Sequence, residues 1–359
     1  MFDKKTMILI PALNPPKNLI NYVYLLKEKG MNDILIINDG SSEKFLEIFN
    51  ILEKIDGVRI FSHAKNLGKG RALKNAFNYF LTLPDISEFN GIITADSDGQ
   101  HSVNDVLNLS KELFNNPNAL ILGCRNFDSV NVPPKSKFGN KITRKVFKFL
   151  YRKNITDTQT GLRGFPMKII PEMLDIFGER FEYETKMLIH CFEKNIPIKE
   201  IEIETIYYDN NSETHFNTII DSFKIYKVIF SSFFRYILTS ISSFLLDIAF
   251  FNLFLVILIS TIGRGTKTIF ISTIFARILS SIFNFFMNKN FVFEGEKNTK
   301  NTILRYYILC ISQMILSGIL VSTLWEITNG SETFIKIIID TILFLFSYQF
   351  QRLWVFKIK

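Results

Sequence analysis

The sequence has few cysteines and lacks a recognisable export signal. Its three cysteines, Cys124, Cys191 and Cys310, are scattered without metal-ligand spacing, which fits reduced thiols and excludes a cysteine-rich metal site. The opening MFDKKTMILIPAL has too short an apolar run for a signal peptide and is typical of a first strand. We therefore expect the first half of the chain to stay in the cytoplasm.

A P-loop is also absent. The stretch NLGKGRALKNAF (66–77) places Gly68, Lys69 and Gly70 before a predicted helix, but the G-x-x-x-x-G-K-[S/T] spacing is missing. Backbone N–H groups and the Lys69 charge can still help to hold a phosphate at the start of a helix. The alternative is a tight loop that carries a solvated lysine.

Charged residues become scarce after about residue 225, whereas the earlier part mixes charges, turn residues and short apolar runs as a soluble domain does. Four apolar stretches follow, each close to the roughly 20 residues that a helix needs to cross a bilayer. They cover residues 236–262, 268–293, 306–327 and 333–356. The sequence therefore predicts a soluble half followed by an all-α membrane domain with four spans.

Cations are distributed unevenly around the predicted spans. The loop between spans two and three and the C-terminal tail carry Lys289, Lys297, Lys300, Arg305, Arg352, Lys357 and Lys359. The loop between spans three and four has no Lys or Arg between Tyr307 and Phe334. This asymmetry predicts that both termini lie in the cytoplasm, although Arg264 and Lys267 go against it. The net charge of +8 suits an anionic inner leaflet.

Short apolar runs alternate with helical stretches up to about residue 123, which is typical of a parallel sheet with helices on both faces. The predicted strands are residues 6–12, 33–39, 58–62, 91–95 and 119–123. The predicted helices lie near residues 18–29, 43–55, 70–81 and 103–114. Ligands bind such sheets beyond the carboxyl ends of the strands, where PALN, NDGS and DSDGQ all fall.

The run IITADSDGQH (92–101) ends a predicted strand in two aspartates, Asp96 and Asp98. Side chains alternate along an extended chain, so both carboxylates point the same way and can share one divalent cation. The alternative is an acidic turn, because Asp and Gly are common turn residues. Three polar turns at one edge of the sheet favour the metal site.

Eight stretches resemble, in their order, family 2 glycosyltransferases of the GT-A fold: IPALN, INDGS, NLGKGRALK, DSDGQH, GCRNF, DTQTGLRGF, FEYET and TIYYDNNSETHF. The resemblance is closest to polyprenyl-phosphate sugar transferases such as dolichyl-phosphate mannose synthase and bactoprenol glucosyltransferase. It covers residues 6 to about 226. It implies a Rossmann-like α/β domain, residues 1–226, that binds a nucleotide sugar.

The resemblance also implies roles for individual residues. The nucleotide sugar would contact Pro11, Ala12, Asn14, Asp39, Lys69 and Asp96. Mg²⁺ or Mn²⁺, which prefer oxygen ligands, would be bound by Asp96, Asp98 and Gln100. The lipid phosphate would be held by Arg125, Arg144, Arg163 and His215. The expected catalytic residues are Asp98, Asp157 and Arg125.

Two parts of this pattern stay open. Asp157 and Arg163 are expected near the acceptor as orienting groups, with a structural ion pair within the loop as the alternative. The stretch NPPKN departs from the family, because acidic residues often follow the first Asn. The nucleotide base is therefore not fixed by the resemblance.

Two stretches fit an acceptor that lies in a membrane. Residues 138–154 interleave Lys and Arg with Val, Phe and Leu, which is typical of a helix in the headgroup plane. Residues 217–232 would form a second interfacial helix that leads into the first span. The alternative for the first stretch is a solvated basic helix that caps the domain.

The second half contains an internal repeat and resembles the GtrA-like family of four-span proteins, here residues 233–359. FNFFMNKNFVF (283–293) aligns with FSYQFQRLWVF (346–356), and RYIL near 235 echoes RYYIL near 305, which suggests a duplicated helical hairpin. Charges within spans are costly. We therefore expect Asp247, Arg277 and Asp340 to face the interior and to pair, for packing or for transport.

Together, these features predict a membrane-bound inverting glycosyltransferase of the EC 2.4.1 type. It would transfer a hexose from a nucleotide sugar, preferably a UDP-hexose, to undecaprenyl phosphate. The lipid-linked sugar would then be used to modify cell-envelope polysaccharide. We expect a multi-pass protein of the bacterial plasma membrane that binds no nucleic acid and is compatible with a homo-oligomer.

Two other functions compete with this prediction. The first is a processive polysaccharide synthase, but QFQRLW (349–354) breaks the Q-x-x-R-W spacing that such enzymes usually carry. The second is a lipid-linked sugar flippase whose soluble half only binds ligand. The complete set of predicted site residues, among them Asp39, Asp98 and Arg125, argues against a degenerate site.

Overall fold

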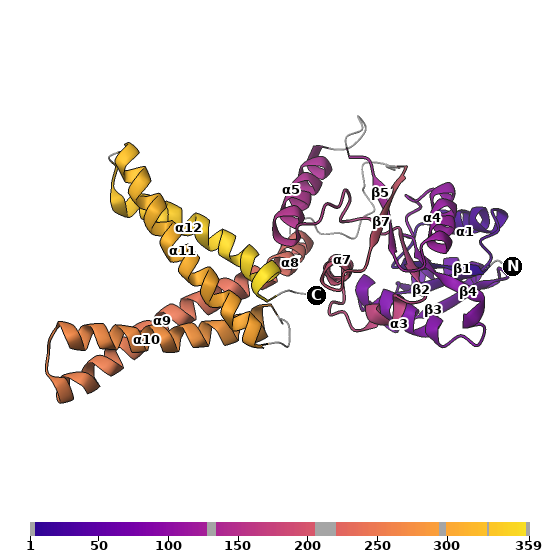
Figure 1. The fold of residues 1–359 in the computed structure, drawn as a ribbon. Helices are drawn as coiled ribbons and strands as arrows, with labels where there is room; N and C mark the ends of the chain where they lie inside the picture. Colours follow the sequence, from indigo (N-terminus) through magenta and orange to yellow (C-terminus); the bar gives the residue numbers. More distant parts are fainter. Residues whose placement is uncertain (1–3, 128–133, 205–219, 294–298, 329, 357–359) are drawn as a thin grey trace. The chain divides into compact units, whose positions relative to one another are not determined.

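The computed structural model describes residues 4–127, 134–204, 220–293, 299–328 and 330–356. The chain divides into two compact units, Met1–Ile229 and Phe230–Lys359 (Figure 1).

The first unit is built on a seven-stranded sheet with the strand order β3-β2-β1-β4-β6-β5-β7. Its strands are β1 (Lys5–Ala12), β2 (Ile34–Asn38), β3 (Val58–Ser62), β4 (Phe89–Thr94), β5 (Leu120–Arg125), β6 (Arg163–Pro166) and β7 (Ile198–Ile203). Its α-helices are α1 (Asn18–Glu28), α2 (Leu46–Leu52), α3 (Lys69–Leu81), α4 (Val103–Asn115), α5 (Pro134–Tyr151), α6 (Ile170–Leu174), α7 (Glu182–Glu193) and α8 (Ile220–Ile229). The α/β fold and all five predicted strands are confirmed.

The five predicted strands run parallel, as expected, but the sheet is mixed because it contains a further strand, β6, that the sequence did not predict. β6 runs antiparallel to both of its neighbours, β4 and β5, whereas the other strand pairs are parallel. Its four residues, RGFP, are too few to show a strand period and include a proline. The register sets Arg163 opposite Thr94 and Leu122, so β6 begins at the edge where β4 and β5 end.

Helices cover both faces of the sheet, and this explains why its central strands are apolar on both sides. One core cluster joins the sheet to α3, α6 and α7, and the other joins it to α1, α2 and α4. All five residues of β2 are buried. With both faces covered, the edge at the carboxyl ends of the strands is where a ligand is expected to bind.

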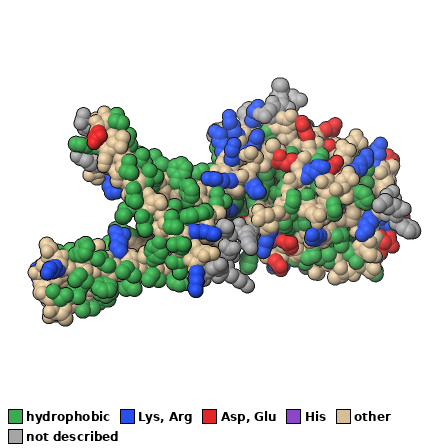
Figure 2. All heavy atoms as spheres, in the orientation of Figure 1, with side chains coloured by type: hydrophobic (Ala, Val, Ile, Leu, Met, Phe, Trp, Pro, Cys, Tyr) green, Lys and Arg blue, Asp and Glu red, His purple; other side chains and the backbone are tan. Residues whose placement is uncertain are grey.

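The second unit consists of four long helices, α9 (Ser231–Ile262), α10 (Thr266–Met287), α11 (Thr299–Thr328) and α12 (Glu332–Phe350). Hydrophobic side chains cover much of their surface (Figure 2). Within the described part of the chain, four helices are long and apolar enough to cross a membrane: Ser231–Ile262, Thr266–Val292, Lys300–Thr328 and Thr333–Val355. The predicted membrane domain with four spans is therefore confirmed.

The sequence repeat corresponds to two hairpins that meet through equivalent residues. Each hairpin ends in a π-helical turn, η4 (Asn288–Val292) and η5 (Gln351–Val355). The equivalent side chains of Asn288 and Gln351 are hydrogen-bonded to each other at 3.0 Å. The equivalent rings of Phe293 and Phe356 stack with centroids 5.2 Å apart. Contacts between equivalent residues are typical of an approximate two-fold axis between the hairpins.

The charges within the spans pair, but they do not all face the interior. Arg277 lies 3.6 Å from Asp247, yet 73% of its side chain is exposed in this unit. Asp340 pairs with Lys336 at 2.9 Å and is 46% exposed. The prediction of an interior position was therefore wrong for Arg277 and Asp340, because helix periodicity alone did not reveal how far the hairpin faces are covered.

A substitution on α3 tests the core of the first unit. Phe77 is fully buried, and its ring contacts Phe165 of β6 edge-on with centroids 5.1 Å apart. Phe77→Ala should lower the free energy of unfolding by about 3–5 kcal/mol, because it removes these contacts and leaves a cavity. Urea unfolding of the full-length protein in detergent measures the change.

The matched control is Phe177→Ala, since the Phe177 side chain is 84% exposed. It should change the free energy of unfolding by less than about 0.5 kcal/mol. Equal losses in the two variants would contradict the described core.

Candidate active site

Asp96 lies two residues beyond the end of β4 and contacts two side chains, Lys69 of α3 and His101 of the turn that follows β4. Lys69 at the start of α3 places its Nζ 2.7 Å from Asp96 Oδ1 and 3.1 Å from Glu184 Oε1 on α7. His101 Nε2 lies 3.2 Å from Asp96 Oδ2. Burial disfavours the charge on Asp96, but Lys69 and His101 outweigh it and hold the pKa of the carboxyl well below its usual range. Asp96 is therefore ionised and balanced by a lysine.

Asp98 has the opposite electrostatic character. Burial, and next the negative charge of Asp96, raise the pKa of Asp98 above its usual value. Its Oδ1 accepts a hydrogen bond of 3.0 Å from the backbone N–H of Gln100. Two carboxylates that share a site in this way favour a cation between or beside them.

The described residues contain no cluster of three or more His, Cys, Asp or Glu side chains that could hold a metal ion. A cation at this position would therefore take further ligands from other oxygen groups, as Mg²⁺ does with substrate phosphates.

The loop before β6 lies directly against Asp96. A Cβ atom on Gly161 would come within 2.3 Å and 2.5 Å of the two Asp96 carboxylate oxygens, so a larger residue here would displace the Asp96 carboxylate. Thr94 Oγ1 donates a hydrogen bond of 2.7 Å to the carbonyl oxygen of Gly161 and fixes the approach. The end of β4 and the DTQTGLR stretch thus form one continuous site.

Arg125, the last residue of β5, forms a two-pronged ion pair with Asp157. Its Nε and Nη2 donate to Asp157 Oδ2 and Oδ1 at 2.7 and 3.2 Å. Asp157 is fully buried, whereas 23% of the Arg125 side chain is exposed. The guanidinium also lies 5.1 Å from the ring of Phe127. Asp157 therefore fixes the orientation of an arginine that still reaches the surface.

The prediction that Arg163 contacts the acceptor needs correction. Its side chain is only 1% exposed. Its guanidinium donates hydrogen bonds to the backbone carbonyl oxygens of Thr160 and Glu184 at 2.9 and 2.6 Å. Arg163 therefore connects the loop before β6 to α7 from inside the domain. The alternative expectation was an ion pair between Asp157 and Arg163, but Asp157 pairs with Arg125 instead.

Asp39, at the end of β2, is 3% exposed and faces the loop before α3. Its carboxylate accepts hydrogen bonds from the N–H groups of Leu67 and Gly68 at 2.9 and 2.8 Å. It also lies 2.7 Å from Nδ1 of His63. The loop that leads to Lys69 is thus tied to the sheet through Asp39.

The end of β1 forms the neighbouring part of the edge. Pro11 and Ala12 close the strand, and Ala12 is buried. Asn14 has a φ of 49°, its N–H donates to Ser41 Oγ at 2.8 Å, and its Oδ1 accepts from the N–H of Ser42 at 2.9 Å. These bonds hold the first two polar turns together.

Two predicted acceptor residues remain, Arg144 and His215. Arg144 is half-buried on α5, and His215 lies outside the described residues. The rings of Phe147 and Tyr151 on α5 pack against Phe192 of α7 with centroids 6.0 and 5.9 Å away. Lysines and arginines gather over α5 (Figure 2). Among the side chains of this helix that the structure describes, Lys137, Lys141, Lys145 and Lys148 are exposed.

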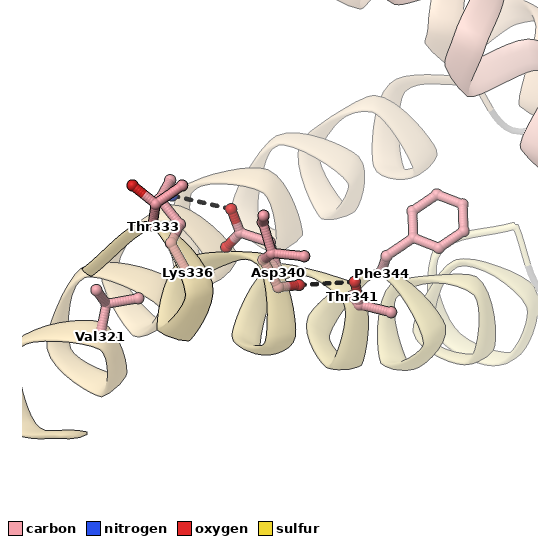
Figure 3. Close-up of a pocket in the computed structure, with 7 residues that line it drawn as sticks. Val321, Thr333, Lys336, Asp340, Thr341 and Phe344 are labelled. Atoms are coloured by element: carbon pink, nitrogen blue, oxygen red, sulfur yellow. Dashed lines mark hydrogen bonds and ion pairs between the residues drawn. The ribbon is translucent and has the colours of Figure 1, made fainter. Parts of the chain in front are cut away.

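A separate cavity of about 630 Å³ lies on α11 and α12 of the second unit (Figure 3). Its lining combines the ion pair of Lys336 and Asp340 with the apolar side chains of Val321, Ile337 and Phe344. None of the predicted site residues lines it.

Sequence reasoning missed His63, His101 and Glu184. Glu184 belongs to the FEYET stretch and His101 ends DSDGQH, so both stood within recognised stretches without a role. Their part in the site depends on contacts between distant elements, which spacing along the chain does not reveal.

Comparison with protein families assigns both units. Residues 7–174 match glycosyl transferase family 2, and residues 235–356 match the GtrA/DPMS transmembrane domain. The protein MJ1222 of Methanocaldococcus jannaschii is 30% identical over 233 residues, which span 63% of this chain and 92% of that protein.

Two further relatives carry functional names. The UDP-N-acetylglucosamine–dolichyl-phosphate N-acetylglucosaminyltransferase of Methanococcus voltae is 28% identical over 249 residues, 63% of this chain and 95% of that protein. The glycosyltransferase AglJ of Haloferax volcanii is 23% identical over 218 residues, 60% of this chain and 67% of that protein.

Among solved structures, glucosyl-3-phosphoglycerate synthase from Mycobacterium tuberculosis aligns with a TM-score of 0.47 and 15% identity, covering 64% of this chain and 79% of that one. The two family matches lie in the order that the sequence predicts. The chain belongs to glycosyl transferase family 2, and its second half is a GtrA/DPMS transmembrane domain that makes it a multi-pass membrane protein.

Proposed function

We propose that this glycosyltransferase moves a sugar from a UDP-sugar to a polyprenyl phosphate and leaves a lipid-linked monosaccharide. The proposal rests on two features that lie at the same edge of the sheet: an acidic cluster, and an arginine whose side chain is held by a buried aspartate. Asp96 and Asp98 follow β4, and Arg125 ends β5 beside buried Asp157. The name of the Methanococcus voltae relative supports UDP-N-acetylglucosamine beside a UDP-hexose as donor, and dolichyl phosphate beside undecaprenyl phosphate as acceptor.

The acidic cluster fits the diphosphate end of the donor and a divalent cation. Asp98 and Gln100 offer oxygen ligands of the kind that Mg²⁺ and Mn²⁺ prefer, and Asp96 lies beside them. The hydroxyl of Tyr22 is buried without a partner among the described residues, and burial followed by the charges of Asp96 and Asp98 raises its pKa. An unpaired buried hydroxyl beside carboxylates fits a polar ligand in this space. When bound, the cation would neutralise charge on the leaving diphosphate.

Arg125 fits the acceptor phosphate. A guanidinium binds phosphate through two parallel hydrogen bonds, and Asp157 holds its plane in one orientation. A phosphate monoester has a second pKa of about 6, so it is an anion at neutral pH and needs no general base. Its oxygen would attack the anomeric carbon opposite the nucleotide, which inverts the configuration. Arg163 would act indirectly by holding the loop in place.

The membrane position follows from charge and hydropathy. The exposed lysines of α5 would lie at the headgroups, and the four spans would keep the site near the acceptor phosphate. The excess of Lys and Arg beside the ends of spans two, three and four supports a cytoplasmic location for the first unit and both termini. Holding both substrates at the membrane surface orients the reacting groups toward each other and lowers the entropic cost of bringing them together.

Asp98→Asn tests the reaction and its cation together. Full-length protein in detergent is incubated with undecaprenyl or dolichyl phosphate, a panel of UDP-sugars and Mg²⁺ or Mn²⁺, and the glycolipid is identified by mass. The wild type should form one glycolipid. Asp98→Asn and EDTA should each reduce turnover at least about 100-fold, since charge stabilisation of a leaving group is worth several kcal/mol.

Asp175→Asn provides the control, because Asp175 is exposed at the end of α6. It should keep wild-type turnover. Full turnover in EDTA would rule out the cation, and the absence of any glycolipid from the wild type would rule out the proposed reaction.

Arg125→Ala tests the acceptor site. The KM for polyprenyl phosphate should rise about tenfold or more, because a charge-assisted fork is lost, and Arg125→Lys should not restore it. Binding of UDP, measured by calorimetry, should change less than about twofold, since the arginine touches only the acceptor in this assignment. Arg59→Ala, at the opposite edge of the sheet, is the control. Weaker UDP binding with an unchanged lipid KM would move Arg125 to the donor site.

A further inference from the structure

Lys69 lies between the carboxylates of Asp96 and Glu184. Its Nζ lies 2.7 Å from Asp96 Oδ1 and 3.1 Å from Glu184 Oε1, and its side chain is 19% exposed. Glu184 itself is only 10% exposed. One ammonium thus bridges a carboxylate of the acidic cluster and a carboxylate that lies outside it.

We propose that Lys69 is a tethered counter-ion for Asp96 and that Glu184 is the positioning residue that receives it when a divalent cation enters. This inference rests on the proposed function, because it concerns the same acidic cluster. A lysine and a divalent cation repel each other at short range, so both cannot bind Asp96 closely. With Glu184 on its other side, the ammonium can leave Asp96 and stay paired.

The backbone brings Lys69 and Glu184 together by close packing of α3 and α7. A Cβ atom on Gly70 would lie 2.6 Å from Tyr183 Cβ and 2.8 Å from the carbonyl carbon of Glu179. Glycine at this position therefore lets the two helices approach, and the next residue on each side of the contact is Lys69 or Glu184.

Further contacts fix both ends of the lysine bridge. Asp39 accepts a hydrogen bond from the N–H of Gly68, the residue before Lys69. Arg163 donates to the backbone oxygen of Glu184 at 2.6 Å. With both backbones held, the exchange between Asp96 and Glu184 requires only a rotation of the long lysine side chain.

The same two elements carry a second lysine pair that supplies a matched control. Lys74, further along α3, lies 2.8 Å from Glu179 Oε1, just before α7. The side chain of Lys74 is 11% exposed, close to that of Lys69, but Glu179 also pairs with Arg71 and not with the acidic cluster. Lys74→Met therefore removes a lysine of similar burial without touching Asp96, and Glu179→Gln removes the charge of its partner carboxylate, which is 43% exposed.

The test measures Mn²⁺ binding directly, on full-length protein in detergent, by electron paramagnetic resonance of free Mn²⁺ without nucleotide. Lys69→Met should tighten Mn²⁺ binding by about fivefold or more, because Asp96 and Asp98 lose their internal cation. Glu184→Gln should weaken it by about fivefold or more, because the ammonium is left with Asp96 as its carboxylate partner among the described residues. Lys74→Met and Glu179→Gln should stay within about twofold of the wild type.

The opposite signs separate this proposal from its rivals. If Lys69 only bound the donor diphosphate, Lys69→Met would leave binding of Mn²⁺ alone unchanged, which would overturn the proposal. An unchanged affinity in Glu184→Gln would do the same, and this isosteric variant decides the matter if Lys69→Met fails to fold. A wild type that binds no Mn²⁺, or an Asp98→Asn variant that binds it normally, would overturn the cation site itself and the inference with it.

Discussion

The close approach of two carboxylates at the end of β4 is the constraint on which the first unit depends. Asp96 and Asp98 are partly buried together, and the pKa of Asp98 is raised by burial and by the negative charge of Asp96. The surrounding structure supplies the compensation: α3 brings Lys69, the following turn brings His101, and Gly161 lets the loop before β6 pack against Asp96. The positions of these three segments are therefore explained by the need to balance the charge of the two carboxylates.

A different constraint governs the second unit. Apolar helices gain little from contact with one another in lipid, so polar side chains and close packing must join the two hairpins. The described contacts fit this requirement. Asn288 donates to Gln351, and the hydroxyl of Tyr306 donates to Asn284 at 2.8 Å. These groups lie near the π-helical turns of the repeat, so the repeated stretches supply polar contacts between the two hairpins.

Much of the fold could be predicted because apolar periodicity and the lengths of hydrophobic runs report directly on burial. β6 escaped prediction because four residues with a proline carry no periodic signal. The site was harder to predict. DSDGQH marked the acidic cluster, but the clamp on Arg125 by Asp157, the burial of Arg163 and the bridge from Lys69 to Glu184 join residues that are distant in the chain. A sequence motif identifies which residues matter, whereas their partners depend on topology.

The bond that breaks in the donor is the central point of the proposed reaction. If the lipid phosphate attacks the anomeric carbon, the nucleotide leaves with both of its phosphates. Quantifying the released nucleotide against the glycolipid, by chromatography of one reaction of the full-length protein, decides this. We predict one nucleoside diphosphate for each lipid that carries a single phosphate and a sugar. A nucleoside monophosphate with a lipid diphosphate sugar, or a nucleoside diphosphate with free sugar and no glycolipid, would contradict the proposed reaction.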